Sequence, residues 1–185
     1  MKQKATYALF GGSFDPPHIG HKEIIKEVLK LDFIDRVLVV PTYLNPFKSN
    51  FSVEPKKRLE LVKKSFKIDG VEISSYEIDQ KRAVYTVQTL RELGKIYNIK
   101  AIVIGADNLN NIEKWSEFNY LNSAIEWIVV TRENIDIDCS KLNRCKKIKL
   151  SIDVSSSEIR EGKKLDYLDK KIKKQVEVEY NLEKS

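Results

Sequence analysis

The fold is decided by residues 5–21, which read ATYALFGGSFDPPHIGH. A short apolar run, Ala5–Phe10, ends at two glycines and is typical of a buried strand. Pro16 and Pro17 keep the preceding backbone extended and favour a helix that starts just after them. A strand, a glycine-rich turn and a helix are therefore expected in this order.

Strands and helices continue to alternate along the rest of the chain. Buried strands are expected at 36–40, 71–73, 101–104, 127–130 and 148–152, and helices at 55–66, 85–97, 109–115, 156–161 and 168–180. This alternation predicts an α/β fold: a Rossmann-like, doubly wound parallel sheet followed by C-terminal helices. No repeat or linker divides the chain, so residues 1–185 are expected to form a single domain.

Composition limits the classes of protein that remain. The chain carries a net charge of +6, which suits a protein that binds nucleic acid or phosphorylated small molecules. No apolar run approaches the ~20 residues of a membrane span, and no apolar segment of signal-peptide length follows Met1–Lys4. A cytoplasmic protein is expected. Cys139 and Cys145 match no zinc motif and are expected to be free thiols, and Lys170–Lys174 is expected to be a solvated helix face.

Both histidines of the chain lie directly after the first strand. His18 and His21 share one face of a helix at a spacing of three residues. The turn before them can bring Gly11 and Gly12 close to a ligand and offer backbone N–H groups to phosphate oxygens, and Gly20 leaves room between the two rings. Helix capping by the histidines and a zinc site remain as alternatives.

A second anion-binding pattern lies near the end of the chain, in Val154–Arg160. Ser155 and Glu158 have the spacing of a capping box, so a helix should begin there. Helix N-termini attract anions, serine hydroxyls add donors, and Arg160 adds a forked cation that suits phosphate. Simple capping by the serines is the alternative.

The first stretch resembles the His-x-Gly-His signature of the nucleotidyltransferase superfamily. Val154–Arg160 is similar to its second signature, usually Ile-Ser-Ser-Thr-x-Ile-Arg, with valine for isoleucine and Ser157 for threonine. The resemblance implies that His18, His21 and Arg160 are the catalytic groups. It implies that ATP is bound by Gly11, Gly12, Ser13, Phe14, His18, Gly20, His21, Gly105, Asp107, Ser155, Ser156, Ser157 and Arg160.

Three segments in the middle of the chain resemble the nicotinate-nucleotide adenylyltransferases. They are Pro41–Lys48, Tyr85–Leu90, and Ile104–Leu109 with Trp115 downstream. This resemblance implies a mononucleotide site formed by Lys48, Tyr85, Thr86 and Trp115. One departure is Phe47, which stands where the family often has histidine.

The residue types in these segments suit such a ligand. Trp115 offers a flat apolar face on which a pyridine ring can stack, although a core tryptophan would look the same. Thr86 stands at a predicted helix start, which favours a carboxylate over a neutral amide. Asp107 can accept hydrogen bonds from ribose hydroxyls, and Lys48 can meet a phosphate. Helix capping by Thr86 or Asp107 and a surface lysine at 48 remain open.

The expected reaction is adenylyl transfer from ATP to nicotinate mononucleotide, giving deamido-NAD and pyrophosphate. The acceptor phosphate would attack the α-phosphorus directly. Mg²⁺ is expected on the ATP phosphates, with no protein metal site. The partners are then small molecules rather than nucleic acid or a membrane, and a homo-oligomer stays open. Alternatives are a nicotinamide mononucleotide or phosphopantetheine adenylyltransferase and, more distantly, a non-catalytic nucleic-acid-binding protein.

Overall fold

Residues 4–132 and 137–182 are described by the computed structural model. Within them, six parallel strands form one sheet in the order β3-β2-β1-β4-β5-β6. The strands are β1 (Thr6–Gly12), β2 (Arg36–Pro41), β3 (Val71–Ile73), β4 (Asn98–Gly105), β5 (Glu126–Arg132) and β6 (Cys145–Leu150). The predicted parallel α/β sheet is confirmed.

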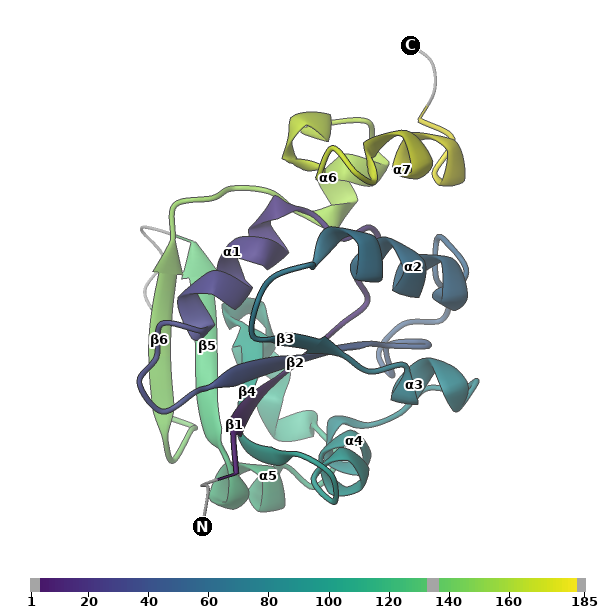
Figure 1. Ribbon diagram of the computed structural model, residues 1–185. Helices are drawn as coiled ribbons and strands as arrows, with labels where there is room; N and C mark the ends of the chain where they lie inside the picture. Colours follow the sequence, from purple (N-terminus) through teal and green to yellow (C-terminus); the bar gives the residue numbers. More distant parts are fainter. Residues whose placement is uncertain (1–3, 133–136, 183–185) are drawn as a thin grey trace.

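Helices cover both faces of this sheet (Figure 1). They are α1 (Ile19–Val28), α2 (Pro55–Ser65), α3 (Tyr76–Asp79), α4 (Thr86–Leu93), α5 (Phe118–Ala124), α6 (Ser156–Arg160) and α7 (Lys173–Glu179), with 3₁₀ helices η1 (Ala106–Lys114) and η2 (Leu165–Tyr167). Helices α1 and α2 lie on one face, whereas α4 and α5 lie on the other. The last three elements, α6, η2 and α7, pack together beside α2 at the C-terminal end of the chain.

Alternate residues of each strand supply the two halves of the core. Ala8 and Phe10 of β1 pack with Ile25 of α1 and Val62 of α2. Leu9, between them, belongs to the cluster of α4, η1 and α5. Because both faces of a parallel sheet are covered, its central strands are continuous apolar runs, which made them easy to predict.

The order of the strands places a crevice at the C-terminal ends of β1 and β4. From β1 the chain builds outward through β2 to β3, and then returns to the other side of β1 for β4, β5 and β6. Phe10 is paired with Val103, so Gly11 and Gly12 end beside Gly105. Ligands of doubly wound sheets bind where the order reverses in this way.

Some predicted boundaries are wrong. The predicted 168–180 helix begins only at Lys173, and the 3₁₀ helix η2 precedes the predicted range. Lys170 and Lys171 therefore precede the helix rather than form its face. Strand β6 begins at Cys145, before the predicted 148, and the predicted 109–115 helix is a 3₁₀ helix.

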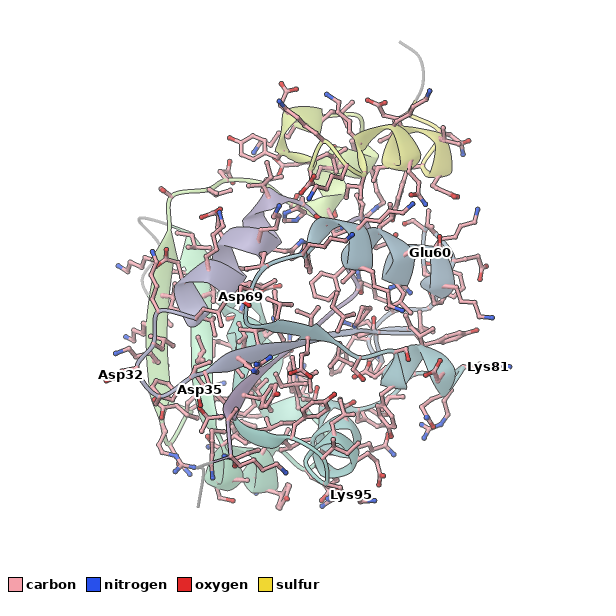
Figure 2. The ribbon with its side chains drawn as sticks, viewed as in Figure 1. Asp32, Asp35, Glu60, Asp69, Lys81 and Lys95 are labelled. Atoms are coloured by element: carbon pink, nitrogen blue, oxygen red, sulfur yellow. A yellow bond between two sulfur atoms is a disulfide. The ribbon has the colours of Figure 1, made fainter. Side chains whose placement is uncertain are left out.

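Charged side chains such as Glu60, Lys81 and Lys95 point outward (Figure 2).

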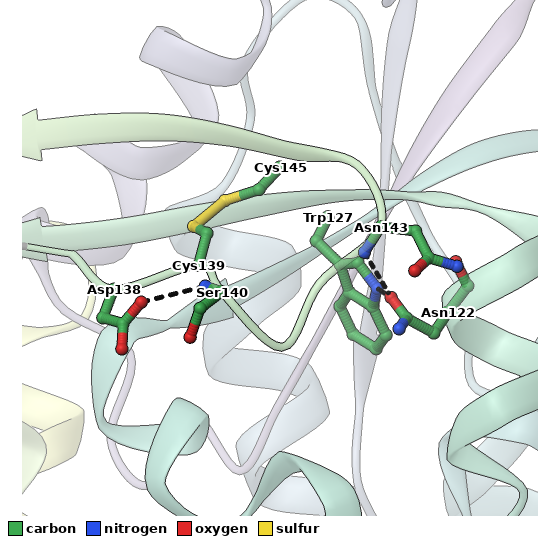
Figure 3. Close-up of a disulfide and its surroundings, with 7 residues drawn as sticks. All are labelled: Asn122, Trp127, Asp138, Cys139, Ser140, Asn143 and Cys145. Atoms are coloured by element: carbon green, nitrogen blue, oxygen red, sulfur yellow. Dashed lines mark hydrogen bonds between the residues drawn. A yellow bond between two sulfur atoms is a disulfide. The ribbon is translucent and has the colours of Figure 1, made fainter.

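The prediction of two free thiols is wrong, since Cys139 and Cys145 form a disulfide (Figure 3). A turn in which the N–H of Leu142 donates to the carbonyl of Cys139 reverses the chain before β6. It brings the two α-carbons to a distance of 6.3 Å.

No helix among the described residues is long and apolar enough to cross a membrane. Residues 1–3, part of the argument against a signal peptide, lie outside the described ranges.

Arg58 of α2 joins the loops that follow β1 and β2. Its side chain is 1% exposed, and the guanidinium donates to the backbone carbonyls of Ser13, Thr42, Tyr43 and Val53. Burial lowers the pKa of Arg58, but an arginine stays charged at neutral pH. One buried cation thus satisfies four loop carbonyls at the C-terminal edge of the sheet.

We expect Arg58→Leu to lower the free energy of unfolding by about 3 kcal/mol or more, because several buried carbonyls lose their donor at once. Urea unfolding at neutral pH measures this loss. The control is Lys57→Leu, one residue away, which removes only a partly exposed ion pair with Glu179 and should cost below about 1 kcal/mol. Equal losses in the two variants would contradict this role of Arg58.

Candidate active site

The two anion-binding segments predicted from the sequence lie against each other. Ser156 Oγ donates to the carbonyl of Pro16 at 2.9 Å, and the Arg160 guanidinium donates to the carbonyl of Asp15. A Cβ on Gly20 would stand 2.9 Å from Val154 Cγ1 and 3.0 Å from the His18 ring. The chain therefore joins segments about 140 residues apart. The space at Gly20 is filled by these two side chains, so the expected room for a ligand there is absent.

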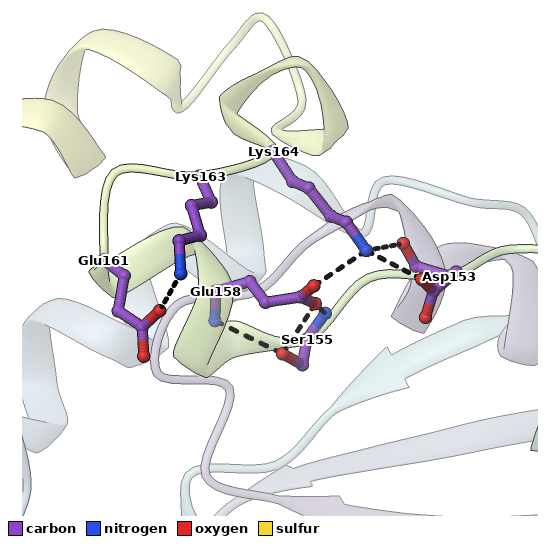
Figure 4. Close-up of polar contacts among 6 residues, drawn as sticks. All are labelled: Asp153, Ser155, Glu158, Glu161, Lys163 and Lys164. Atoms are coloured by element: carbon purple, nitrogen blue, oxygen red, sulfur yellow. Dashed lines mark hydrogen bonds and ion pairs between the residues drawn. The ribbon is translucent and has the colours of Figure 1, made fainter.

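Helix α6 begins with the predicted capping box (Figure 4). The N–H of Glu158 donates to Ser155 Oγ at 3.2 Å, and the N–H of Ser155 donates to Glu158 Oε2 at 2.9 Å. Lys164 lies 2.8 Å from the same carboxylate. Arg160 donates to Ser157 Oγ at 3.0 Å. The capping reading of Ser155 is thus correct, and it fixes where the other serines and Arg160 lie.

The imidazoles of His18 and His21 are stacked. Their centroids are 3.7 Å apart and their planes are tilted by 28°. The backbone N–H of His18 donates to His21 Nδ1 at 3.2 Å. In the neutral ring the proton then resides on Nε2, which can donate to a phosphate oxygen. His18 Nδ1 is buried and has no hydrogen-bond partner among the described residues.

Both rings are neutral at physiological pH in the free protein. Burial lowers the pKa of His18 to about 4, although the Glu158 carboxylate acts in the opposite direction. Burial and the neighbouring His18 hold the pKa of His21 well below its usual value. The pair therefore offers hydrogen-bond donors rather than fixed charges to a ligand.

Phe14 supports the histidine pair, while Gly12 and Gly105 line the open pocket and lie close to neighbouring side chains. Phe14 is 2% exposed and its ring lies edge-on to His21, with centroids 5.0 Å apart. It has a φ of 47°, a value that β-carbon-bearing residues adopt rarely. A Cβ on Gly12 would come within 3.0 Å of the Phe14 ring, and one on Gly105 within 2.4 Å of Asp107 Oδ1. Glycine is required for these close approaches.

Asp15 links the first site to two other parts of the chain. Its Oδ1 accepts a hydrogen bond from the Tyr180 hydroxyl at 2.7 Å, and its Oδ2 accepts one from the N–H of Ser52 at 3.0 Å. Burial and the carboxylate of Asp15 raise the pKa of Tyr180, so its hydroxyl remains a donor. Sequence reasoning missed this contact, because nothing local pairs an aspartate with a tyrosine 165 residues later.

An open pocket lies at the C-terminal ends of β1 and β4, on the side of α4. Its volume is about 900 Å³, which includes solvent at its mouth. Tyr85, Thr86 and Trp115 line it, with Phe47 at 62% exposure. Thr86 is the first residue of α4, as predicted. Trp115 is partly buried and lies edge-to-face against Trp127, with centroids 6.0 Å apart.

Lys48 and Asp107, which were expected to contact a substrate phosphate and a ribose, lie outside this pocket. Lys48 lines a smaller neighbouring hollow together with Asp15 and Arg58. Asp107 is exposed on η1, where its Oδ1 accepts a hydrogen bond from Asn108 Nδ2 at 3.2 Å, and it is Asn108 that lines the pocket.

Glu77 is a pocket residue that the sequence did not reveal. It lies on α3, a helix of four residues that is too short to show a periodic pattern. Thr89 Oγ1 donates to its Oε1 at 2.6 Å. The sequence showed only that a glutamate stands eight residues before Tyr85, in a segment for which no helix or strand was predicted.

The side chains of the described residues limit how this site could hold Mg²⁺. Among the described residues, no group of three or more His, Cys, Asp or Glu side chains could hold a metal ion. A hard cation at this site would depend on oxygens that a substrate brings and on water.

A doubly wound sheet whose switch point carries a histidine pair and a serine-led helix defines a nucleotidyltransferase. Comparisons agree with this class: the model of the cytidylyltransferase-like family matches residues 9–162. The probable nicotinate-nucleotide adenylyltransferase of Sulfurovum sp. (strain NBC37-1) is 41% identical over 177 residues, covering 95% of this chain and 94% of its own. That of Aliarcobacter butzleri (strain RM4018) is 43% identical, covering 91% and 93%.

The chain belongs to the nicotinate-nucleotide adenylyltransferases of the cytidylyltransferase-like family. Its fold is also that of the Plasmodium falciparum nicotinic acid mononucleotide adenylyltransferase complexed with NaAD, with a TM-score of 0.77 at 23% identity. That match covers 96% of this chain and 97% of the other.

Because the chain has only two histidines, NMR can follow each imidazole. We expect no titration of either ring between pH 5.5 and 8 in the free folded protein, whereas both should titrate near 6.5 in urea. The unfolded state takes up protons as the pH falls below about 6.5, whereas the folded state does not. The free energy of unfolding should therefore decrease as the pH is lowered from about 6.5 to 5.5. A native midpoint near 6.5 for both rings would contradict the burial argument.

Proposed function

We propose that this enzyme transfers the adenylyl group of ATP to nicotinate mononucleotide, releasing pyrophosphate and forming deamido-NAD. One observation carries the proposal: the His18–His21 segment and α6 converge beside a pocket whose wall holds Tyr85, Thr86 and Trp115. Family membership supports the same reaction, because the relatives are named for it. We also propose that residues 1–185 act as one nucleotidyltransferase domain in the cytoplasm.

In this proposal ATP binds beside the N-terminal ends of α1 and α6, at the C-terminal end of β1. Arg160 and the hydroxyls of Ser156 and Ser157 are assigned to β- and γ-phosphate oxygens. In the free protein Ser156 donates to the carbonyl of Pro16 and Arg160 to Ser157. His21 donates from Nε2, and neutral His18 donates from one of its two ring nitrogens. Gly11, Gly12 and Ser13 present backbone to the nucleotide. Binding a tetra-anionic ligand would also favour the protonated imidazoles and raise their pKa.

The acceptor phosphate is the nucleophile. One of its oxygens attacks the α-phosphorus of ATP and forms a new P–O bond, while the bond from that phosphorus to the α,β-bridging oxygen breaks and pyrophosphate leaves in line. The phosphate monoester has a second pKa of about 6, so it is largely dianionic at neutral pH. No side-chain nucleophile is needed, and the protein contributes orientation and charge stabilisation.

The pocket beside α4 receives the pyridine ring. Trp115 offers its ring face for stacking, and Tyr85 and Phe47 border the mouth. Thr86 opens α4, whose N-terminal N–H groups favour the nicotinate carboxylate. We assign Lys48 to the acceptor phosphate and Asp107 to a ribose, although both lie outside the pocket in the free protein. These assignments make the acid the preferred substrate.

Mg²⁺ would be held mainly by the ATP phosphates and water. When bound, it neutralises charge on the β- and γ-phosphates and on the departing pyrophosphate. The residues around it have the task of holding the two substrates in line.

The test measures pyrophosphate release from Mg-ATP with nicotinate mononucleotide, nicotinamide mononucleotide and phosphopantetheine in parallel. We expect release with the first compound at the highest kcat/KM. Higher kcat/KM with phosphopantetheine would reject the proposed acceptor. Release with none, together with nanomolar salt-sensitive nucleic-acid binding, would reject the enzymatic function altogether.

We expect His21→Ala to lower kcat by about 10²–10³, since it removes a preorganised donor to the triphosphate. Its unfolding midpoint in urea should show that the fold is retained. The control is Lys26→Ala on the exposed side of the same helix, where Lys26 forms an ion pair with Glu23, and its kcat should stay within about twofold of the original. Near-normal turnover in His21→Ala would refute the role given to this ring.

A further inference from the structure

Glu77 is a buried carboxyl group in the wall of the pocket, and the reaction proposed above leaves it without a role. It is 5% exposed. Its Oε1 accepts a hydrogen bond from Thr89 Oγ1 at 2.6 Å. Its Oε2 is buried and has no hydrogen-bond partner among the described residues. A buried carboxyl oxygen without a partner is costly, and Glu77 is one of the residues that line the pocket.

The raised pKa of the Glu77 carboxyl group does not come from charged neighbours. The charged side chains of the surrounding elements are engaged elsewhere: Asp79 of α3 with Ser75, Arg91 of α4 with Glu117, Arg36 of β2 with Glu72 of β3. Lys48 lines the neighbouring hollow, and Tyr85 is half-exposed. Burial therefore dominates and raises the pKa of Glu77 to about 7, with the Thr89 hydrogen bond opposing it.

We propose that Glu77 is a specificity-determining residue that recognises the pyridine substituent, donating a hydrogen bond from protonated Oε2 to the carboxylate of nicotinate. The inference rests on the proposed function. Because Thr89 occupies Oε1, Oε2 is the oxygen that carries the proton. An O–H donor to a carboxylate makes a short, charge-assisted hydrogen bond. Thr89 lies one turn beyond Thr86 on α4, so the acid group and the helix start act on the same ring substituent.

The two possible ring substituents respond differently to ionisation of Glu77. An ionised Glu77 beside the nicotinate carboxylate places two like charges in a buried site, which disfavours binding. The amide of nicotinamide accepts a hydrogen bond from the neutral acid and donates one to the ionised form, so it tolerates both. The preference for the acid should therefore decline as pH rises through about 7.

The experiment measures KM for nicotinate mononucleotide, and KM or the inhibition constant for its amide, from pH 6 to 8.5. The quantity compared is the constant for the acid divided by the constant for the amide, and it rises when the acid binds less well. This ratio cancels the titration of the phosphate and of the ATP site, which both ligands share. We expect the ratio to rise by about tenfold or more across this range, because only the protonated fraction of Glu77 binds the acid well.

Two variants test whether Glu77 is the group responsible. In Glu77→Gln the amide oxygen still accepts from Thr89 and the NH₂ group donates at every pH, so the ratio should become flat. Asp79→Asn removes the same charge from the same helix at an exposed position and should keep the original rise. A purely structural Glu77 would change the unfolding midpoint of Glu77→Gln and leave the pH slope of the ratio unaltered.

The possible failures are distinguishable. A ratio that is constant with pH in the unmodified enzyme overturns the role of Glu77 and leaves the proposed function standing, and this reading needs no variant to fold. A rise that persists in Glu77→Gln overturns it as well. Absence of pyrophosphate release with both mononucleotides overturns the proposed function and this inference together.

Discussion

The site depends on how the partly buried loops at the C-terminal edge of the sheet satisfy their backbone carbonyls. These loops cannot pair with one another as strands do, and a buried carbonyl without a donor is unfavourable. Two arginines resolve this: Arg58 donates to four loop carbonyls, and Arg160 donates to that of Asp15. Arg58 comes from the helix that directly follows the second loop, and Arg160 lies 145 residues after Asp15, in α6. The same hydrogen bonds that satisfy the backbone therefore also set where the histidine segment and α6 lie.

The histidine pair shows how burial can prepare a site for an anion without a permanent charge. Stacked rings 3.7 Å apart would repel each other if both were protonated. Burial keeps them neutral, and the backbone N–H of His18 fixes the tautomer of His21. Phe14 holds His21 from the side. The free protein thus avoids the cost of two adjacent buried cations while keeping donors in place for phosphate oxygens.

Much of this arrangement could be predicted because the signals were local. Central strands were continuous apolar runs, the capping box at Ser155 and Glu158 identified the start of α6, and Thr86 marked that of α4. Long-range contacts had no such signal. Tyr180 on Asp15 and Arg58 on the loop carbonyls depend on tertiary packing. The disulfide was missed because a cytoplasmic protein was expected to keep free thiols. Helix α3 was missed because four residues are too few to show a helical period of apolar residues.

The geometry also bears on how two highly charged substrates are kept apart until they react. The histidine segment and α6 lie on the α1 and α2 side of the sheet, whereas the pocket of Trp115 and Glu77 lies on the α4 side. Between them stand Gly11 and Gly12, at the end of β1, which have no side chains. If ATP and the mononucleotide bind as proposed, their phosphates meet over these glycines. Substrate recognition then takes place on opposite faces of one sheet, and the reacting phosphorus lies at the point where backbone can approach it most closely.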